Sequence, residues 1–384
     1  MSEYLSIKTS VIQWACERMG MLYPELASKK EFNNLNKEEN GIVKLTMKQL
    51  KSLASQLRYP LAYFMLDEPV TDIDTLSIND FRTQKSTRVK TSISLREQVD
   101  YCKRQQEWFS DYVRSNDFDS FKYINHFRLN DNPVDAGITI KEHLNINYIF
   151  SKNEVDYLTA IKRTLENKLI LVITSKVLKQ TTHRLDTAEF RGFALTDKYA
   201  PLIFVNGNDS PRAQIFTICH ELGHICLGLS GVSDISLYNT QKTEKWCNEF
   251  AANILMPKDD ITVDFNESLG IQDFLKNANK KYHISNEALL VRIYKLHLIK
   301  KDLFLKEIKK EEQNYLEKQK KDDKDASGGN YYNNVGSRLS KLLTNALISS
   351  TAVGETTLRD ATYLLGLKSI SVFDRLSRKL GENK

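Results

Sequence analysis

The sequence predicts a mainly helical α+β fold with one small sheet, flanked by helical units at both ends of the chain. Apolar residues recur at helical spacing through most of the sequence, which indicates amphipathic helices. Three short apolar runs with turn residues between them predict strands, at residues 170–174, 193–195 and 201–205. A charged run from Lys306 to Asp325 with almost no apolar residues predicts a solvated helix or linker before a separate tail.

Composition bounds the class of protein. The chain has 384 residues, 41% of them hydrophobic and 27% charged, which is typical of a globular protein with two or three domains. It contains no apolar stretch of the eighteen or so residues that a membrane helix needs, and no secretory signal pattern. Five cysteines without a CxxC pair favour reduced thiols and therefore a cytoplasmic location. A net charge of +6 permits a nucleic-acid contact but does not demand one.

We expect four segments. Residues 1–75 form short helices, with Pro24 opening one and Thr46 capping the next, and this order suggests a helix-turn-helix type of bundle. A docking bundle that touches no DNA is an equally good interpretation, because residues 30–41 are nearly charge-balanced. Residues 76–300 form the core domain, 301–327 the charged helix or linker, and 328–384 a small helical unit.

The segment from Ser210 to Gly231 carries the chemistry. Ser210 and Pro211 are a helix start, and Gly228 to Gly231 is a helix stop. Apolar residues at 3–4 spacing form one buried face, and His220, Glu221 and His224 fall on another. His220 and His224 lie one turn apart and can therefore bind one metal ion. Glu221 beside them is placed to act as the base that takes a proton from a water activated by the metal.

Chance is the first alternative to consider for this motif. With seven histidines in the chain, an HExxH arises by chance in roughly one such sequence in a hundred. The two histidines would then be ordinary surface residues on an amphipathic helix. A chance match should ignore the phase of the helix, and this one does not, so the metal site is the better interpretation.

A third ligand is expected on the following helix, where Glu244 and Glu249 compete. On a helical wheel Glu244 falls within the apolar arc, beside Ala251 and Leu255, whereas Glu249 faces solvent. A buried carboxylate needs a partner, and a divalent cation supplies one. We therefore predict Glu244 as the ligand. Asn248, one turn later, could hydrogen-bond a ligand histidine.

Three further parts of the sequence are weaker candidates for the site. His183 could reach it from a loop, but an ordinary exposed histidine is the better interpretation, so it is left out of the metal set. Residues 191–195 form either an open edge strand that could hold an extended substrate or an interior strand. The sequence does not separate these two placements. Tyr238 is the one guess for a group that stabilises the oxyanion.

The two motifs together resemble the ImmA/IrrE family of bacterial and phage metallopeptidases. HELGH at His220–His224 is followed by a second motif from Glu244 to Pro257, in which Cys247 stands where alanine is usual. Asp80-Phe81-Arg82-Thr83 matches a D-F-R-T segment of the family. The N-terminal region is similar to a degenerate helix-turn-helix of longer members, although Lys37-Glu38 replaces a Trp-Glu pair. The GGNYY and DATYLLGLK segments resemble the C-terminal extension of those members.

The resemblance implies a zincin-like core of the gluzincin kind, with two helices packed on a small sheet and Zn²⁺ between them. It implies His220, His224 and Glu244 as zinc ligands and Glu221 as the catalytic base. It also implies an endopeptidase that cleaves a specific protein partner, a transcriptional repressor of the XRE type, in a mobile-element, phage or stress response.

Two alternatives stand beside this interpretation. One is a DNA-binding transcription regulator or toxin–antitoxin component that uses residues 1–75 on DNA and has a non-proteolytic metal site. The other is a protein in which zinc serves folding alone, and three protein ligands disfavour it because they leave a coordination position open.

Overall fold

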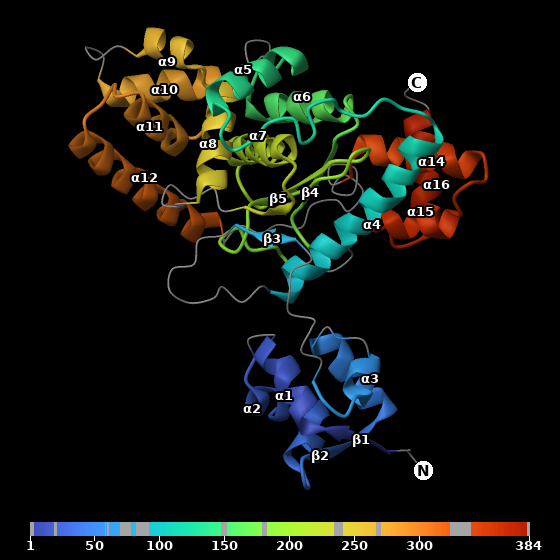
Figure 1. Cartoon of the computed structure of the whole chain (residues 1–384). Coiled ribbons are helices and arrows are strands. Elements are labelled where there is room, and N and C mark those ends of the chain that lie inside the picture. Colours follow the sequence, from blue (N-terminus) through green and yellow to red (C-terminus); the bar gives the residue numbers. More distant parts are fainter. Residues whose placement is uncertain are drawn as a thin grey trace. The chain divides into compact units, whose positions relative to one another are not determined.

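The computed structural model describes residues 4–18, 21–57, 59, 61–69, 78–81, 92–146, 152–178, 183–233, 241–265, 270–322 and 339–381. The chain divides into two compact units. The first contains residues 1–77 and 87–97, and the second contains residues 78–86 and 98–384. Figure 1 shows the elements of each unit in sequence colours.

The first unit combines a two-stranded sheet with short helices. Strand β1 (Tyr4–Lys8) pairs antiparallel with β2 (Ile42–Thr46). The helices are α1 (Thr9–Arg18), α2 (Tyr23–Ala27), the 3₁₀ helix η1 (Lys30–Asn36), α3 (Met47–Leu57) and the 3₁₀ helix η2 (Leu61–Met65). Their apolar faces form one buried cluster, which includes Ile12, Leu26, Phe32, Leu50 and Leu53.

The N-terminal helices start where the sequence predicts, but the two strands were not predicted. Pro24 lies in the first turn of α2. Thr46 accepts a hydrogen bond from the backbone N–H of Gln49, and the side chain of Gln49 accepts one from the N–H of Thr46, so the two form a capping box. Neither strand is a continuous apolar run, because Ser6 interrupts the first and Lys44 the second, so the criterion that identifies the other three strands misses them.

The second unit is mainly helical. Its helices up to residue 255 are α4 (Ile93–Ser115, from residue 98 onward), α5 (Pro133–Leu144), α6 (Glu154–Glu166), α7 (Pro211–Leu227) and α8 (Lys242–Leu255). Those that follow are α9 (Lys258–Asp264), α10 (Ile271–Tyr282), α11 (Asn286–Lys295) and α12 (Lys301–Asp322). Three more lie near the C-terminus: α14 (Lys341–Ala352), α15 (Leu358–Leu364) and α16 (Ile370–Gly381).

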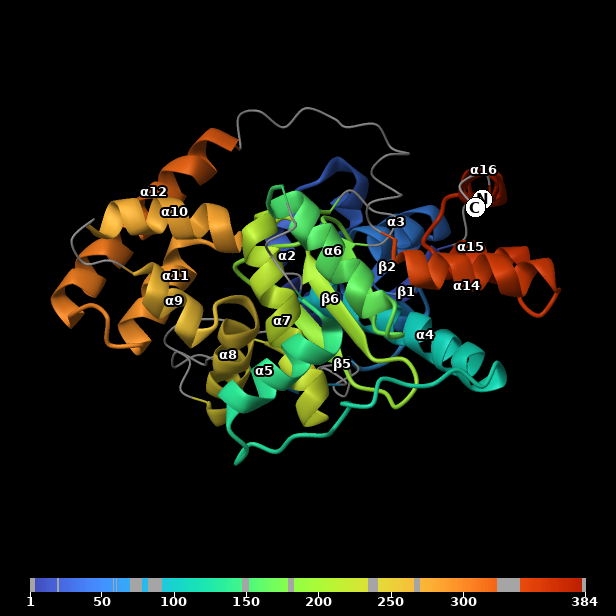
Figure 2. The ribbon, with the colours of Figure 1, turned by 90° about the horizontal axis from the view of Figure 1, so that it is seen from above.

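A five-stranded mixed sheet lies beneath α6 and α7 (Figures 1 and 2). Its strands are β3 (Asn79–Asp80), β4 (Leu171–Ser175), β5 (Gly192–Leu195), β6 (Leu202–Asn206) and β7 (Gly231–Val232), in the order β3-β7-β5-β6-β4. The pairs β4–β6 and β3–β7 are parallel, whereas β5 is antiparallel to both of its neighbours. The expectation of a mainly helical α+β fold with a small sheet is confirmed.

Strand β5 lies inside the sheet, so the open edge considered for residues 191–195 is not found. Phe193 and Ala194 pair with β6 on one side and with β7 on the other. Both residues are fully buried. The short β7 follows the glycine-rich end of α7 and occupies the position that an added substrate strand would need.

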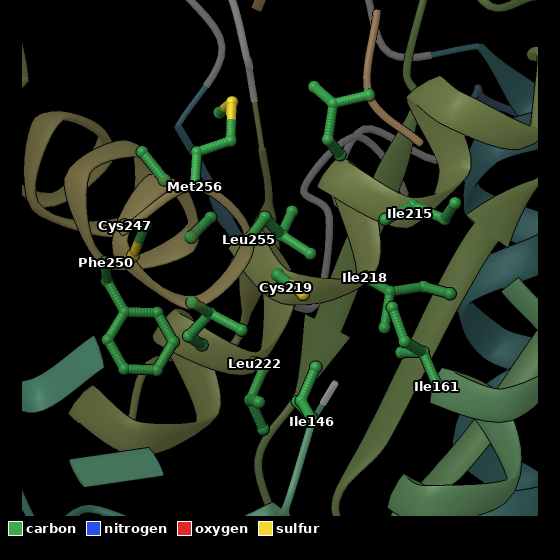
Figure 3. Packing of buried hydrophobic residues seen from close by; sticks show 14 of the residues in the cluster. Ile146, Ile161, Ile215, Ile218, Cys219, Leu222, Cys247, Phe250, Leu255 and Met256 are labelled. Carbon is green, nitrogen blue, oxygen red and sulfur yellow. The ribbon is translucent and has the colours of Figure 1, made fainter. Parts of the chain in front are cut away.

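The core of the second unit is centred on the contact between α7 and α8. Figure 3 shows Cys219 and Leu222 of α7 close to Leu255 of α8, with Ile161 of α6 beside Ile218. Gly223 permits this close approach, because a Cβ at that position would lie 3.1 Å from Phe250 Cδ1 and 3.2 Å from Cys247 Sγ. The α7–α8 contact fixes the relative position of the predicted metal ligands.

Helix α12 departs from the expectation of a purely solvated segment. Ile308 is buried, and Leu303 and Phe304 pack against the core of the second unit. Phe304 stacks on Tyr294 of α11 with ring centroids 4.4 Å apart. The first half of the charged helix is therefore part of the core fold. Among the described residues, no helix is long and apolar enough to cross a membrane.

Candidate metal centre

Helix α7 begins and ends at the residues that the sequence predicts. Ser210 accepts a hydrogen bond from the N–H of Ala213, and Pro211 is the first helical residue. Gly228 ends the helix at a φ of 75°, a left-handed conformation that favours glycine. All residues from Gln214 to Leu227 except Phe216 are buried, so the face that carries the histidines is enclosed as well as the apolar one.

Three predicted ligands meet between α7 and α8. The Nε2 atoms of His220 and His224 lie 3.2 Å apart. One carboxylate oxygen of Glu244 lies 3.2 Å from His220 Nε2, and the other lies 3.0 Å from His224 Nε2. None of the three side chains is exposed to solvent. In the described part of the chain, these residues form the one group of three or more His, Cys, Asp or Glu side chains that could hold a metal ion.

The spacing of these atoms fits a small divalent cation. Bonds of about 2.0–2.1 Å in a tetrahedral zinc site place neighbouring ligand atoms roughly 3.3 Å apart. The observed separations of 3.0–3.2 Å are close to this value. Two imidazoles and one carboxylate are also a common donor set of catalytic zinc sites. The residues present therefore fit a metal with one further coordination position.

The ionisation of the cluster supports the same interpretation. Burial raises the pKa of Glu244, but His220 and hydrogen bonds with both histidines outweigh burial and lower that pKa to about 2. Burial lowers the pKa of His224, although its hydrogen bond with Glu244 opposes this. Burial therefore favours the neutral imidazole at His224, which is the form that binds a metal.

Asn248 on α8 orients the first histidine. Its Oδ1 lies 3.0 Å from His220 Nδ1. The amide oxygen can only accept, so Nδ1 of His220 donates, and the lone pair of the imidazole is left on Nε2, which faces Glu244. Sequence reasoning proposed this contact from the spacing of Glu244 and Asn248, one turn apart on the same helix.

Glu221 lies beside the cluster and is fully buried. The hydroxyl of Ser233 donates a hydrogen bond to Oε2 of Glu221 at 3.0 Å. Among the described residues, Oε1 of Glu221 has no hydrogen-bond partner. Burial raises the pKa of Glu221 well above its usual value, and the charge of Glu244 raises it further, against the effect of Ser233. A buried carboxyl with one unsatisfied oxygen is suited to exchanging a proton with a group that enters the site.

Two neighbouring residues complete the walls of the site. Gly192 of β5 lies under Glu221, and a Cβ there would come within 3.0 Å of Glu221 Oε1 and 2.6 Å of Thr217 Cγ2. The ring of Phe81 stacks on the imidazole of His224 with centroids 5.1 Å apart and an interplanar angle of 20°. Phe81 belongs to the D-F-R-T segment, of which Arg82 and Thr83 lie outside the described residues.

The remaining candidates lie elsewhere. Glu249, the rival third ligand, pairs with Arg292 at 2.7 Å and Lys295 at 3.2 Å. His183 is exposed and does not join the metal-ligand group. Tyr238 lies outside the described residues.

Sequence reasoning missed Ser233, which closes on Glu221 from the end of β7. Its signal was weak, because a serine after a two-residue strand has no characteristic spacing. Phe81 was noticed only through the family resemblance, and its contact with His224 joins distant parts of the sequence.

Comparison with known families agrees with this geometry. Residues 166–294 match the model of a peptidase family described as the IrrE N-terminal-like domain. Residues 339–379 match a family described only as a domain of unknown function. Searches of curated proteins and of solved structures gave no significant match. The matched range contains β4 to β7 and all three residues of the metal-ligand group. The chain therefore carries, at residues 166–294, a metallopeptidase domain of the IrrE N-terminal-like family.

Proposed function

We propose that this protein is a zinc-dependent endopeptidase that cleaves one specific protein partner in the cytoplasm, a DNA-binding repressor of the XRE type. One observation carries the proposal: Glu221, a buried carboxyl whose Oε1 has no hydrogen-bond partner among the described residues, lies beside a buried His–His–Glu ligand set. The five cysteines, all within the described residues, are buried and form no disulfide, which suits a reducing compartment. The repressor as substrate is suggested by the family resemblance of the two motifs.

Zinc is the metal that this donor set suits best. Two nitrogen ligands and one carboxylate favour a borderline cation over the hard cations magnesium and calcium, which prefer oxygen ligands. His220, His224 and Glu244 would hold it. When bound, zinc would supply Lewis acidity, which polarises the scissile carbonyl and lowers the pKa of the attacking water.

The residues of the chain perform the proton transfers. Oε1 of Glu221 accepts a proton from the attacking water and later donates it to the leaving amine, so one carboxyl serves as base and then as acid. Ser233 holds Oε2 of Glu221 and so keeps Oε1 as the free oxygen. Asn248 keeps the proton of His220 on Nδ1, away from the site.

The enclosure of the site favours a selective enzyme. His220, Glu221, His224 and Glu244 are all without solvent exposure, and β7 occupies the side of β5 where a substrate strand could have added. A substrate segment must therefore open a path before its carbonyl can reach Glu221. A partner with its own binding surface can provide the free energy for that opening, whereas a random unfolded chain provides little.

Substitution of the base tests the proposal directly. Glu221→Gln keeps the size of the side chain and the contact with Ser233 but removes the carboxylate. We expect full zinc content and a cleavage rate lower by a factor of about 10³ or more. Loss of an acid–base group usually lowers a rate by a factor of at most about 10⁴. The variant should also retain bound substrate, so partners captured with it are identified and then incubated with the wild-type enzyme.

The matched control is Glu249→Gln on α8, which makes the same chemical change at a residue paired with Arg292. It should cleave at a rate close to that of the wild type. If Glu221→Gln cleaves as fast as the wild type, Glu221 is not the base. If the zinc-loaded wild type leaves every captured partner intact, the peptidase proposal fails and a non-proteolytic metal site becomes the better interpretation.

A further inference from the structure

The C-terminal helices form a three-helix unit with precise caps. Ser340 caps α14 by accepting from the N–H of Leu343. Thr357 caps α15 by accepting from the N–H of Asp360, and its hydroxyl donates to the carboxylate of Asp360. Helix α15 contacts both α14 and α16. The core of the unit consists of small and branched residues around one aromatic ring: Leu343, Ala346, Leu347, Ala361, Leu364, Leu365, Leu367 and Phe373.

The connection from α15 to α16 is a short glycine turn. Gly366 has a φ of +62°, and the N–H of Leu367 donates to the carbonyl of Thr362 at 2.9 Å. This pattern ends α15 at Leu364, and α16 starts at Ile370 after the five connecting residues 365–369. Two short helices joined by a short turn that contains glycine are the arrangement of a helix-turn-helix, in which the second helix enters the major groove of DNA.

Helix α16 has the two faces that this role requires. Val372, Phe373 and Leu376 face the core of the unit. The opposite face presents Ser371, Arg375 and Arg378, with Lys379 and Asp374 at its borders, and all five residues are exposed. Lys368, in the turn before the helix, is exposed as well. Three cations against one acid on the exposed helix face, with a fourth cation in the turn before it, complement the phosphates and guanine edges of a DNA groove.

The rest of the second unit holds the three helices without covering this face. Leu364 is the last residue of α15. Its carbonyl accepts hydrogen bonds from Tyr101 and from Gln105 of α4, both at 2.7 Å. Trp108 of α4 donates to Thr356 just before α15. Glu166 of α6 accepts hydrogen bonds from the backbone at Lys341 and Leu342, at the start of α14. The anchors thus lie on α14 and α15, and α16 is left with an exposed basic face at the end of the unit remote from α9–α12 (Figure 1).

We propose that residues 339–381 are a helix-turn-helix that binds double-stranded DNA, with α16 as the recognition helix. Arg375 and Arg378 contact bases or phosphates in the major groove, and Ser371 contacts the groove near the start of the helix. This surface differs from the N-terminal region that the sequence suggested for DNA. There the segment of residues 30–41 is nearly charge-balanced and contains only the short η1.

Binding of a short duplex by the full-length protein tests the proposal. Duplexes enriched from a random-sequence pool by the wild type are labelled, and their affinity is measured by fluorescence anisotropy over a salt series that starts at about 50 mM. Arg375→Gln/Arg378→Gln should weaken binding roughly 10- to 100-fold. The plot of the logarithm of the association constant against the logarithm of the salt concentration has a negative slope. The variant should make this slope shallower by about 0.9 for each arginine that contacts a phosphate.

Two variants with the same change of net charge serve as controls. Lys276→Gln/Lys280→Gln alters exposed lysines of α10, and Lys48→Gln/Lys51→Gln alters exposed lysines of α3 in the first unit. Both should bind within about threefold of the wild type. Equal unfolding midpoints for all variants show that folding is intact.

Several outcomes would overturn the proposal. They are the absence of any duplex binding at the lowest salt, undiminished binding by the α16 variant, and equal losses in all three variants. Loss confined to the α3 variant would assign DNA to the first unit. A preference for single strands or for an acidic protein over the duplex would also contradict it.

Discussion

Glu244 of α8 lies with its carboxylate 3.0 Å from Nε2 of His224 on α7, and neither side chain is exposed to solvent. Five residues further along the same helix, Glu249 makes a different pairing, with the guanidinium of Arg292 at 2.7 Å. Two carboxylates on one helix therefore have separate tasks. The first completes a metal-ligand set, and the second joins α8 to α11.

These two residues give a matched test of the metal site. Glu244→Gln replaces an anionic ligand by a neutral amide and leaves the shape of the helix unchanged. We expect the zinc content of the purified variant to fall below about a tenth of that of the wild type, because a site with three protein ligands binds zinc much more weakly when one of them is lost. Glu249→Gln should retain full zinc. Metal analysis after dialysis at neutral pH measures both, and equal zinc in the two variants would refute the role of Glu244.

Asn248 should affect the metal without touching it. Asn248→Ala removes the acceptor that holds the proton of His220 on Nδ1. Loss of such a supporting partner typically lowers metal affinity about 10- to 100-fold. Competition with a chromophoric chelator measures this affinity. Asn248→Asp restores an acceptor and should recover most of it, whereas a purely structural defect would not be rescued by that variant.

The metal site could be predicted from sequence because its signals are local. The phase of HELGH on α7 and the position of Glu244 within the apolar arc of α8 each follow from helical periodicity. The three longest strands of the five-stranded sheet could be predicted from local signals too, since each is a largely continuous apolar run. In each of these cases one segment contains the information.

Features that depend on contacts between distant segments were not predicted. Strands β3 and β7 have two residues each and exist only because they pair with each other and with β5. Ser233 reaches Glu221 only because β7 lies beside β5. The burial of Ile308 and the partial burial of Leu303 in a highly charged helix likewise depend on where α11 lies. Local periodicity contains no information about such contacts.

Ser233 should tune the catalytic step without holding the metal. Ser233→Ala removes the hydrogen bond to Oε2 of Glu221, and the carboxyl can then rotate. Because the hydrogen bond favours the charged form of Glu221, its loss should also raise the pKa of Glu221 further. We expect kcat to fall about tenfold while KM and zinc content stay unchanged. A pH–rate profile with an acid limb shifted to higher pH supports this role, and an unshifted profile with normal kcat would rule it out.

Gly223 should be sensitive to even one methyl group. In Gly223→Ala the new Cβ would lie 3.1 Å from Phe250 Cδ1 and 3.3 Å from the Cα of Cys247. Overpacking of this kind costs about 1–3 kcal/mol, which exceeds the gain of about 1 kcal/mol in helix propensity. Denaturant unfolding should therefore show a net loss of stability. The sulfur of Cys247 lies 3.2 Å from the new methyl group, so Gly223→Ala should cost less stability in a Cys247→Ala background than in the wild type. If the losses in unfolding free energy of the two single variants simply add in the double variant, the proposed clash is contradicted.

The Glu249–Arg292 pair should make stability depend on pH in a defined direction. Burial raises the pKa of Glu249, but Lys295 and Arg292 outweigh burial and lower it below its usual value. The pair therefore stabilises the fold above the unfolded pKa of about 4.3, and this contribution is lost as pH falls through the lower folded pKa.

Glu249→Gln isolates this contribution, because the guanidinium of Arg292 is buried and loses its only anionic contact among the described residues. The free energy of unfolding should fall by about 3 kcal/mol at pH 7, the usual cost of breaking a buried pair. The difference between variant and wild type should shrink as pH falls below about 4 and disappear only below the lowered folded pKa, where Glu249 is protonated in both the native and the unfolded wild type. The metal ligands also take up protons as pH falls, but they are the same in both proteins. Their effect therefore cancels when the free energy of unfolding of the variant is subtracted from that of the wild type at each pH. A difference that stays constant from pH 7 to pH 3 would mean that the charge of Glu249 does not stabilise α8 against α11.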